Sequence, residues 1–257
     1  MTKIVTATVT VKLAHDGRLA LDGSLADQFE PELFDRWRTF DVLPRITPRQ
    51  LLAHTSGLPN YFTEEALSRS LRETPSRARR PVDLVDLAGT QGPPRFLPGE
   101  GFSYSDTGYV IAGMLVEHAT GRPLQQVYRE LVFEPFEMTM TWLEGDESAR
   151  ATEVAHRSDL ARFVRGLWSE RIVDRDGLRE MTSWTPGVWF PPGHALRYGL
   201  GTGSITVEGV ELRGHTGFIG AFAFHAPEYD AILVGTHNAS QVDRWPLVAA
   251  LCRELQL

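Results

Sequence analysis

Apolar and polar positions recur with helical spacing over much of the chain and with strand spacing near its end. The first run, residues 1–13, predicts an amphipathic helix that stops before Gly17. Within the next predicted helix, Thr47 followed by Pro48 is typical of an N-cap and a first turn. The further predicted helices lie at 45–52, 82–87, 108–119 and 123–131.

From Arg197 onward the pattern changes to short β-rich runs separated by turn residues. The runs are RYGLGTGSITV, VELRGHTGFIGAFAFHA and AILVGTHN, and they predict an antiparallel meander over 197–238. An amphipathic helix over about 242–255 is expected to lie on that sheet. The sequence therefore predicts a single α+β domain over 1–257, with a helical region at about 45–195 inserted ahead of the sheet.

Composition narrows the function classes. The chain has 257 residues, of which 42% are hydrophobic, which suffices for a core without disulfide bonds. The net charge of −7 is scattered and argues against a nucleic-acid partner. No run approaches the roughly 20 apolar residues that a membrane span needs. Cys252 is the single cysteine, so we expect no internal disulfide; no cofactor or metal site is predicted either, and the compartment stays open.

Three stretches carry candidate chemistry, in the order LLAHTSGLPNY, PGEGFSYSDTGYVIAGMLVEHATG and GHTGFIGAFAF. Together with PFEMTMT and SDLARFVRGL, they resemble the serine β-lactamase and penicillin-binding protein superfamily, in its branch of class C β-lactamases, DD-peptidases and esterases. The resemblance implies a β-lactamase/transpeptidase-like fold, with an antiparallel sheet, flanking helices and a helical subdomain. It also implies acyl transfer through the motifs SxxK, YxN and KTG or HTG.

The motifs of this family fall on particular residues of the chain. The opening letters MTK match the last three of SxxK, YSD matches the second motif, and HTG matches the third. By resemblance, the catalytic residues are Lys3, Tyr104 and His215. By resemblance, the substrate-binding residues are Asp106, Thr216, Gly217 and Phe218.

The serine of SxxK would stand one position before Met1, and it is not among the 257 residues. The other lysine, Lys12, has Val9 three positions before it, so it forms no such motif. We therefore expect a chain that begins inside the family's fold, lacks the N-terminal strands and is inactive by itself toward acyl substrates. The strand at 231–238 would then form an uncovered sheet edge, through which the chain is expected to self-associate.

The residue types suit acyl transfer, which needs a nucleophile, a base, a proton donor and N–H groups that face the oxyanion. Lys3 and Tyr104 can share the proton transfers if they lie close together. We expect His215 to titrate near neutrality and to orient Tyr104 or meet a substrate carboxylate. The backbone N–H of Phe218 would face the oxyanion. Asp106 replaces the usual asparagine and only accepts hydrogen bonds, which disfavours recognition of a β-lactam side-chain amide oxygen.

The sequence thus favours a serine hydrolase or acyltransferase that acts on a small ester, amide, D-amino-acid peptide or β-lactam through an acyl-enzyme in its complete form. The alternative is a non-catalytic binding protein of the same fold. Structural interpretations of the candidates stay open, with Lys3 as a solvated charge, Tyr104 as a packing residue and His215 as a strand residue. His54 and Asp159 are interpreted as structural.

Overall fold

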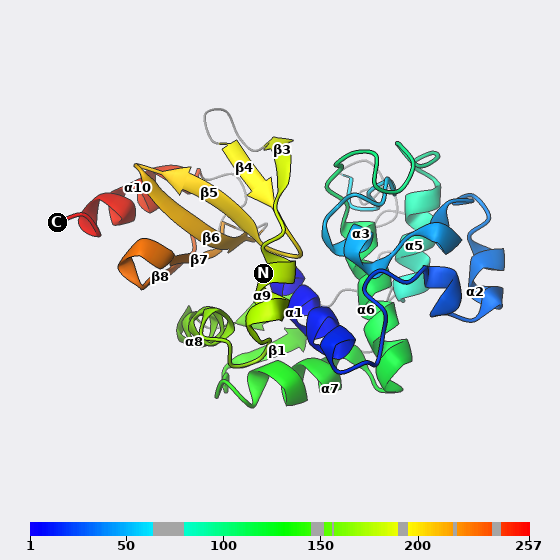
Figure 1. Ribbon diagram of the computed structural model, residues 1–257, viewed down its shortest axis with the longest axis horizontal. Helices are drawn as coiled ribbons and strands as arrows, with labels where there is room; N and C mark the ends of the chain where they lie inside the picture. Colours follow the sequence, from blue (N-terminus) through cyan, green and yellow to red (C-terminus); the bar gives the residue numbers. More distant parts are fainter. Residues whose placement is uncertain (64–79, 145–151, 156, 190–194, 218–219, 238–242) are drawn as a thin grey trace. The chain divides into compact units, whose positions relative to one another are not determined.

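The structure of the chain is a computed structural model (Figure 1). It describes residues 1–63, 80–144, 152–155, 157–189, 195–217, 220–237 and 243–257. The chain divides into two compact units. Unit 1 comprises Met1–Thr8, Tyr128–Trp142 and Glu153–Leu257, and unit 2 comprises Val9–Val127 and Leu143–Thr152. A single domain over 1–257 stays a prediction.

Unit 1 contains a six-stranded sheet in which each strand pairs antiparallel with the next along the chain (Figure 1). The strands are β3 (Thr185–Trp189), β4 (Ala195–Tyr198), β5 (Gly203–Val207), β6 (Val210–Thr216), β7 (Phe222–Ala226) and β8 (Ala231–Gly235). The predicted meander is confirmed, but the sheet starts before residue 197. The sequence pattern did not predict β3, because this strand contains Pro186 and Gly187, two residue types that disfavour strands. The register of its pairing with β4 shifts between Thr185 and Val188, where these two residues lie.

Two helices cover opposite faces of this sheet. Neighbouring residues of a strand point to opposite faces, so Phe224 and His225 show which helix lies on each. The ring of Phe224 lies 6.4 Å from that of Trp245, the first residue of α10 (Trp245–Glu254). The ring of His225 stacks at 5.7 Å on Trp168, the last residue of α8 (Arg157–Trp168). Helix α10 is the helix expected over about 242–255, and it does lie on the sheet.

Strand β8 forms one outer edge of the sheet within the described residues, where it pairs with β7 alone. Only Leu233 among its five residues is buried. An outer strand offers backbone groups for pairing with another chain. Self-association through 231–238 stays a prediction, and Asn238 lies outside the described residues.

The first helix, α1 (Thr2–His15), is not the amphipathic helix that the pattern predicted. All residues from 4 to 11 are buried, including the three threonines among them. The hydroxyl of Thr8 donates to the carbonyl four residues before it at 2.7 Å, and that of Thr6 lies 2.5 Å from the hydroxyl of Tyr128. The prediction was wrong because a threonine counts as polar in a pattern, although its hydroxyl can bond inside a buried helix.

In unit 1, the buried residue Asp159 links helix α8 to residues 140 and 141 through hydrogen bonds. This side chain is fully buried at the start of α8. Its carboxylate accepts hydrogen bonds from the Met140 backbone at 2.8 Å, the Thr141 hydroxyl at 2.9 Å and Arg162 at 2.7 Å. These contacts support the structural interpretation of Asp159. The other elements of unit 1 are a π-helix, η3 (Arg129–Phe133), and α9 (Arg175–Met181). Strands β1 (Thr141–Glu144) and β2 (Thr152–Ala155) form a two-stranded sheet that contains residues of both units.

Replacing Asp159 with alanine is expected to lower the free energy of unfolding by about 3 kcal/mol, because the buried Thr141 hydroxyl, the Met140 N–H and Arg162 all lose their shared acceptor. The matched control is Asp176→Ala, since Asp176 pairs with Arg179 at 2.7 Å while both side chains stay more than 70% exposed. That change is expected to cost less than about 0.5 kcal/mol. Urea denaturation of the two variants measures the difference, and equal midpoints would contradict the role given to Asp159.

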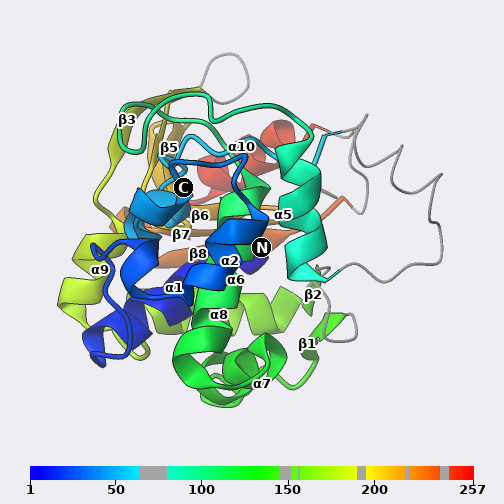
Figure 2. The ribbon, with the colours of Figure 1, turned by 90° about the vertical axis from the view of Figure 1, so that its right-hand side faces the viewer.

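Unit 2 is built around α6 (Asp106–Thr120), which packs against α3 (Pro48–Leu52) and α5 (Pro81–Gly89) (Figure 2). Helix α3 begins as predicted, since the Thr47 hydroxyl accepts from the Gln50 backbone N–H while the Gln50 side chain accepts from that of Thr47. The remaining elements are η1 (Leu25–Asp27), α2 (Pro31–Arg36), η2 (Leu43–Arg45) and α7 (Leu124–Tyr128).

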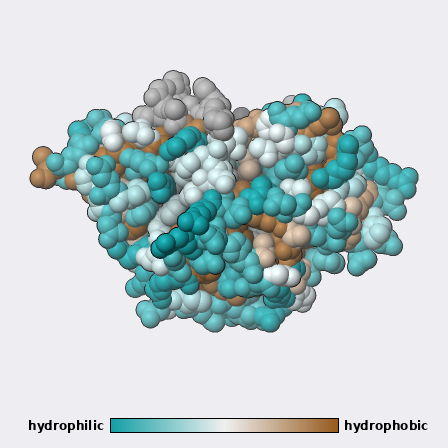
Figure 3. All heavy atoms as spheres, in the orientation of Figure 1, coloured by the Kyte–Doolittle hydropathy of each residue, from teal (hydrophilic) through white to brown (hydrophobic). Residues whose placement is uncertain are grey.

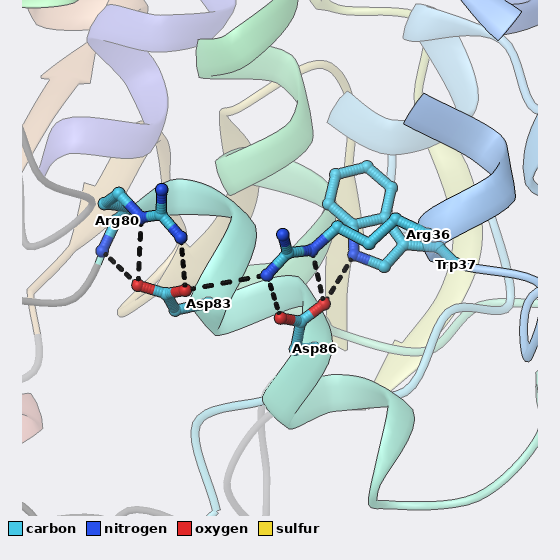
Figure 4. Close-up of polar contacts among 5 residues, drawn as sticks. All are labelled: Arg36, Trp37, Arg80, Asp83 and Asp86. Atoms are coloured by element: carbon cyan, nitrogen blue, oxygen red, sulfur yellow. Dashed lines mark hydrogen bonds and ion pairs between the residues drawn. The ribbon is translucent and has the colours of Figure 1, made fainter. Parts of the chain in front are cut away.

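A polar cluster joins α2 to α5 in unit 2 (Figure 4). Both carboxylate oxygens of Asp86 accept from the guanidinium of Arg36, and the indole of Trp37 donates to the same carboxylate at 2.9 Å. Asp83 lies 3.7 Å from Arg36 and also pairs with Arg80. The two carboxylates therefore hold α5 to α2 and to the residue that precedes α5.

Hydrophilic residues prevail over the face of the molecule in Figure 3. Where the chain is described, its helices are too short or too polar to cross a bilayer.

Candidate active site

Unit 1 brings the first and third candidate motifs together. Lys3 lies in the first turn of α1, and His215 and Thr216 are the last two residues of β6. A Cβ atom built on Gly217 would lie only 3.8 Å from the backbone nitrogen of Met1. The start of α1 therefore adjoins the end of β6, although more than 200 residues separate them along the chain.

The imidazole of His215 is buried and both of its nitrogens have partners. Its Nδ1 lies 2.6 Å from the backbone oxygen of Thr216, and its Nε2 lies 3.0 Å from the hydroxyl of Tyr198 in β4. The rings of Tyr198 and His215 meet edge to face at 84°. His215 therefore contacts its own sheet through both nitrogens.

The surroundings of His215 disfavour its protonated form. Burial, followed by the positive charges of the amino terminus and of Lys3, lowers the pKa of His215 well below its usual value. The hydrogen bond to Thr216 opposes this shift, and the charge of Arg244 adds to it. The expectation that His215 titrates near neutrality is therefore wrong, because the pattern HTG could not show that the ring is buried among cations.

The turn after the third motif is held by Arg244. Its guanidinium donates to the carbonyl of Gly217 at 3.1 Å and to that of Ala221 at 3.4 Å, while the Gly217 N–H donates to the Ala221 carbonyl at 2.7 Å. These bonds close the connection between β6 and β7 at its base. Phe218, whose N–H was predicted to face the oxyanion, lies outside the described residues.

In unit 2, the second motif lies against His54. The rings of Tyr104 and His54 are 4.1 Å apart and inclined at 35°, and 38% of Tyr104 is exposed. His54 itself is buried, and its Nδ1 accepts from the backbone N–H of Ser105 at 3.1 Å. Its backbone oxygen accepts from Ser103 at 2.9 Å. His54 thus shapes the loop that carries Tyr104, in agreement with its structural interpretation.

Asn60 fixes the last residue of the second motif. Its side-chain oxygen accepts from the backbone N–H of Asp106 at 3.0 Å, and its amide nitrogen donates to the Asp106 carboxylate at 3.0 Å. Asp106 is the first residue of α6, where a carboxylate is favoured by the helix dipole. The neighbouring hydroxyl of Thr107 donates to the Pro59 carbonyl at 2.7 Å. The two loops are therefore tied together beside Tyr104.

The structure thus places the predicted residues in two groups. Lys3, His215, Thr216 and Gly217 belong to unit 1, whereas Tyr104 and Asp106 belong to unit 2. The convergence of all three motifs stays a prediction. Among the described residues, no three His, Cys, Asp or Glu side chains are grouped as metal ligands would be.

Sequence reasoning missed Tyr198, Asn60 and Arg244 as residues that shape the candidate site. Asn60 stood in the breaker-rich stretch HTSGLPNY of the first motif region, which could have marked it. Tyr198 and Arg244 gave no such signal, because neither lies in one of the three motif stretches. Each was found through a contact that the fold creates.

Comparisons with known proteins find relatives in the same superfamily that the motifs resemble. A family model described as Beta-lactamase matches residues 1–251. The D-aminopeptidase of Cereibacter sphaeroides is 28% identical over 226 residues, which cover 77% of this chain and 43% of that protein. Esterase EstB of Burkholderia gladioli is 33% identical over 148 residues, which cover 54% of this chain and 36% of the esterase.

A solved structure supports the same assignment. The crystal structure of a D-stereospecific amidohydrolase from Streptomyces sp. matches with a TM-score of 0.76 and 28% identity, over 93% of this chain and 80% of that one. The expected β-lactamase/transpeptidase-like fold is confirmed. The chain spans less than half the length of the curated relatives it matches. From the family model, the motifs and the fold together, this chain belongs to the Beta-lactamase family, within the serine β-lactamase and penicillin-binding protein superfamily.

Proposed function

We propose that this chain carries the acyl-transfer site of a serine hydrolase that acts on esters and amides, including amides and peptides of D-amino acids. The observation that supports this most is the meeting of α1 and β6 in unit 1, where the start of α1, with Lys3 in its first turn, lies beside Gly217. Family relatives named as a D-aminopeptidase and an esterase support the substrate classes.

In the proposed reaction, a serine one position before Met1 attacks the carbonyl carbon of the ester or amide. Lys3, in its neutral form, takes the serine proton as the new C–O bond forms. Tyr104 passes a proton to the leaving alcohol or amine as the tetrahedral intermediate collapses to the acyl-enzyme. Water then hydrolyses that ester with the proton transfers reversed. Lys3, once it holds the serine proton, and Arg244 favour the negative charge that develops on the substrate oxygen.

The remaining residues would bind the substrate. Thr216 and Gly217, at the end of β6, let a substrate lie along the strand, and the N–H of Phe218 would donate to the oxyanion. Asp106, held by Asn60, would accept a hydrogen bond from an N–H group of the substrate. This preference favours amides with a free amino or amide N–H group over substrates that present only an acceptor.

The test compares the 257-residue chain with two versions that carry the dipeptide Gly-Ser or Gly-Ala directly before Met1. A nitrophenyl ester is added, and intact-mass measurement follows the protein. We expect one acyl group per molecule on the Gly-Ser version, and no adduct on the Gly-Ala version or the 257-residue chain. An adduct on all three would contradict the assignment of the nucleophile.

The non-catalytic alternative predicts a different result. A Gly-Ser version that folds like the 257-residue chain, as judged by its circular dichroism and urea midpoint, and yet stays unacylated would contradict the proposed hydrolase. It would support a binding protein of the same fold.

A further inference from the structure

The hydrogen bonds of His215 determine which of its nitrogens carries the proton. The backbone oxygen of Thr216 can only accept a hydrogen bond, and it lies 2.6 Å from Nδ1. A lone pair on Nδ1 would face that oxygen at a repulsive distance, so Nδ1 must carry the hydrogen. In the neutral ring Nε2 is then an acceptor.

The partner of Nε2 must therefore donate, and that partner is the hydroxyl of Tyr198 at 3.0 Å. Tyr198 itself is buried, with 2% of its surface exposed. It is the last residue of β4, two strands away from β6 in the sheet, so this bond crosses β5. Hydrogen bonds in a buried environment constrain both partners, because the cost of leaving either unsatisfied is high.

We propose that Tyr198 is a positioning residue for the third motif. Its hydroxyl donates to Nε2 of His215 and so holds the ring as the neutral tautomer with its proton on Nδ1. Besides the amino terminus of this chain, the charged groups that face this ring are Lys3 in α1 and Arg244, the residue before α10. Each of them, when it carries its positive charge, disfavours a second proton on His215.

If the chain has the proposed function, the hydrogen bonds of His215 restrict which substrates the third motif can bind. A neutral His215 whose two nitrogens are bonded to Thr216 and Tyr198 supplies neither a charge nor a donor to a substrate carboxylate. The third motif therefore suits acyl donors that carry no carboxylate at that position, such as simple amides and esters. His215 then acts by shaping the end of β6 and leaves the proton transfers to Lys3 and Tyr104.

The test observes His215 directly by nitrogen-15 NMR of the histidine-labelled chain, with its signals assigned through their loss in His215→Asn. In the unaltered chain we expect a protonated Nδ1 and an unprotonated, hydrogen-bonded Nε2 that persist as the pH falls through the usual histidine range. In Tyr198→Phe, the onset of protonation is expected to move up by about 0.5 to 1 pH unit, because the neutral form loses one donor.

The matched control is Tyr229→Phe, which removes a hydroxyl from the turn between β7 and β8 and should leave the His215 signals unchanged. A protonated Nε2 in the unaltered chain would overturn the proposal, and so would a Tyr198→Phe chain with unchanged His215 signals. If Tyr198→Phe does not fold, the tautomer in the unaltered chain decides the question. No acyl substrate is used, so this outcome is separate from that of the acylation test.

Discussion

Replacing Tyr104 with phenylalanine is expected to slow acylation of the Gly-Ser version by about 10²–10⁴-fold, the usual contribution of a positioned acid or base. The phenyl ring keeps the 4.1 Å contact with His54, so the packing of the loop should persist. The variant therefore separates proton transfer from folding. The measurement is the rate of nitroaniline release from a D-amino-acid nitroanilide in the first turnover, because an amide nitrogen needs a proton to leave. The urea midpoint is measured beside it.

The matched control for this prediction is Tyr109→Phe. Tyr109 also contacts the His54 ring, at 5.1 Å, but it is buried and its hydroxyl donates to the Leu52 carbonyl at 2.6 Å. Its loss is expected to cost about 1 kcal/mol of stability and to leave the acylation rate nearly unchanged. If Tyr104→Phe acylates at the unaltered rate, Tyr104 is a packing residue and the proton donor must be sought elsewhere.

Replacing Gly214 with alanine is expected to lower the free energy of unfolding by about 3 kcal/mol or more. A Cβ atom on Gly214 would lie 2.0 Å from the backbone oxygen of Ala223 and 2.9 Å from the Cα of Phe224. Both are main-chain atoms of β7, so a side-chain rotation cannot relieve the overlap and the β6–β7 pairing must shift. Because Gly214 directly precedes His215, the shift would also displace the third motif.

Gly89→Ala is the matched control for Gly214→Ala. Gly89 ends α5, and a Cβ atom there would meet only the Phe40 ring, at 3.8 Å. Alanine is the better helix former, so this variant is expected to be as stable as the unaltered chain or up to about 1 kcal/mol more stable. Urea denaturation and near-ultraviolet circular dichroism compare the two. A Gly214→Ala chain with an unchanged midpoint would contradict the close approach of β7.

Local patterns in the sequence were enough to predict the antiparallel meander, the cap at Thr47, the helix on the sheet and the three motifs with their order. Each of these depends on residues that are close together in the chain. Strand alternation is read over a few positions, and a cap depends on a hydroxyl three residues from the N–H that it accepts. The family assignment drew on the same local signals, because a motif is a short run of residues.

The tertiary structure alone decided what surrounds those motifs. It buries residues 4–11 of α1, places Tyr198 against His215, and brings Asn60 to Asp106 from 46 positions away. It also lowers the pKa of His215, which the sequence analysis placed near neutrality. A pKa depends on burial and on charges in space, and Lys3 and Arg244 reach His215 from opposite ends of the chain. No pattern of neighbouring residues encodes such contacts, because they form only when distant elements pack together.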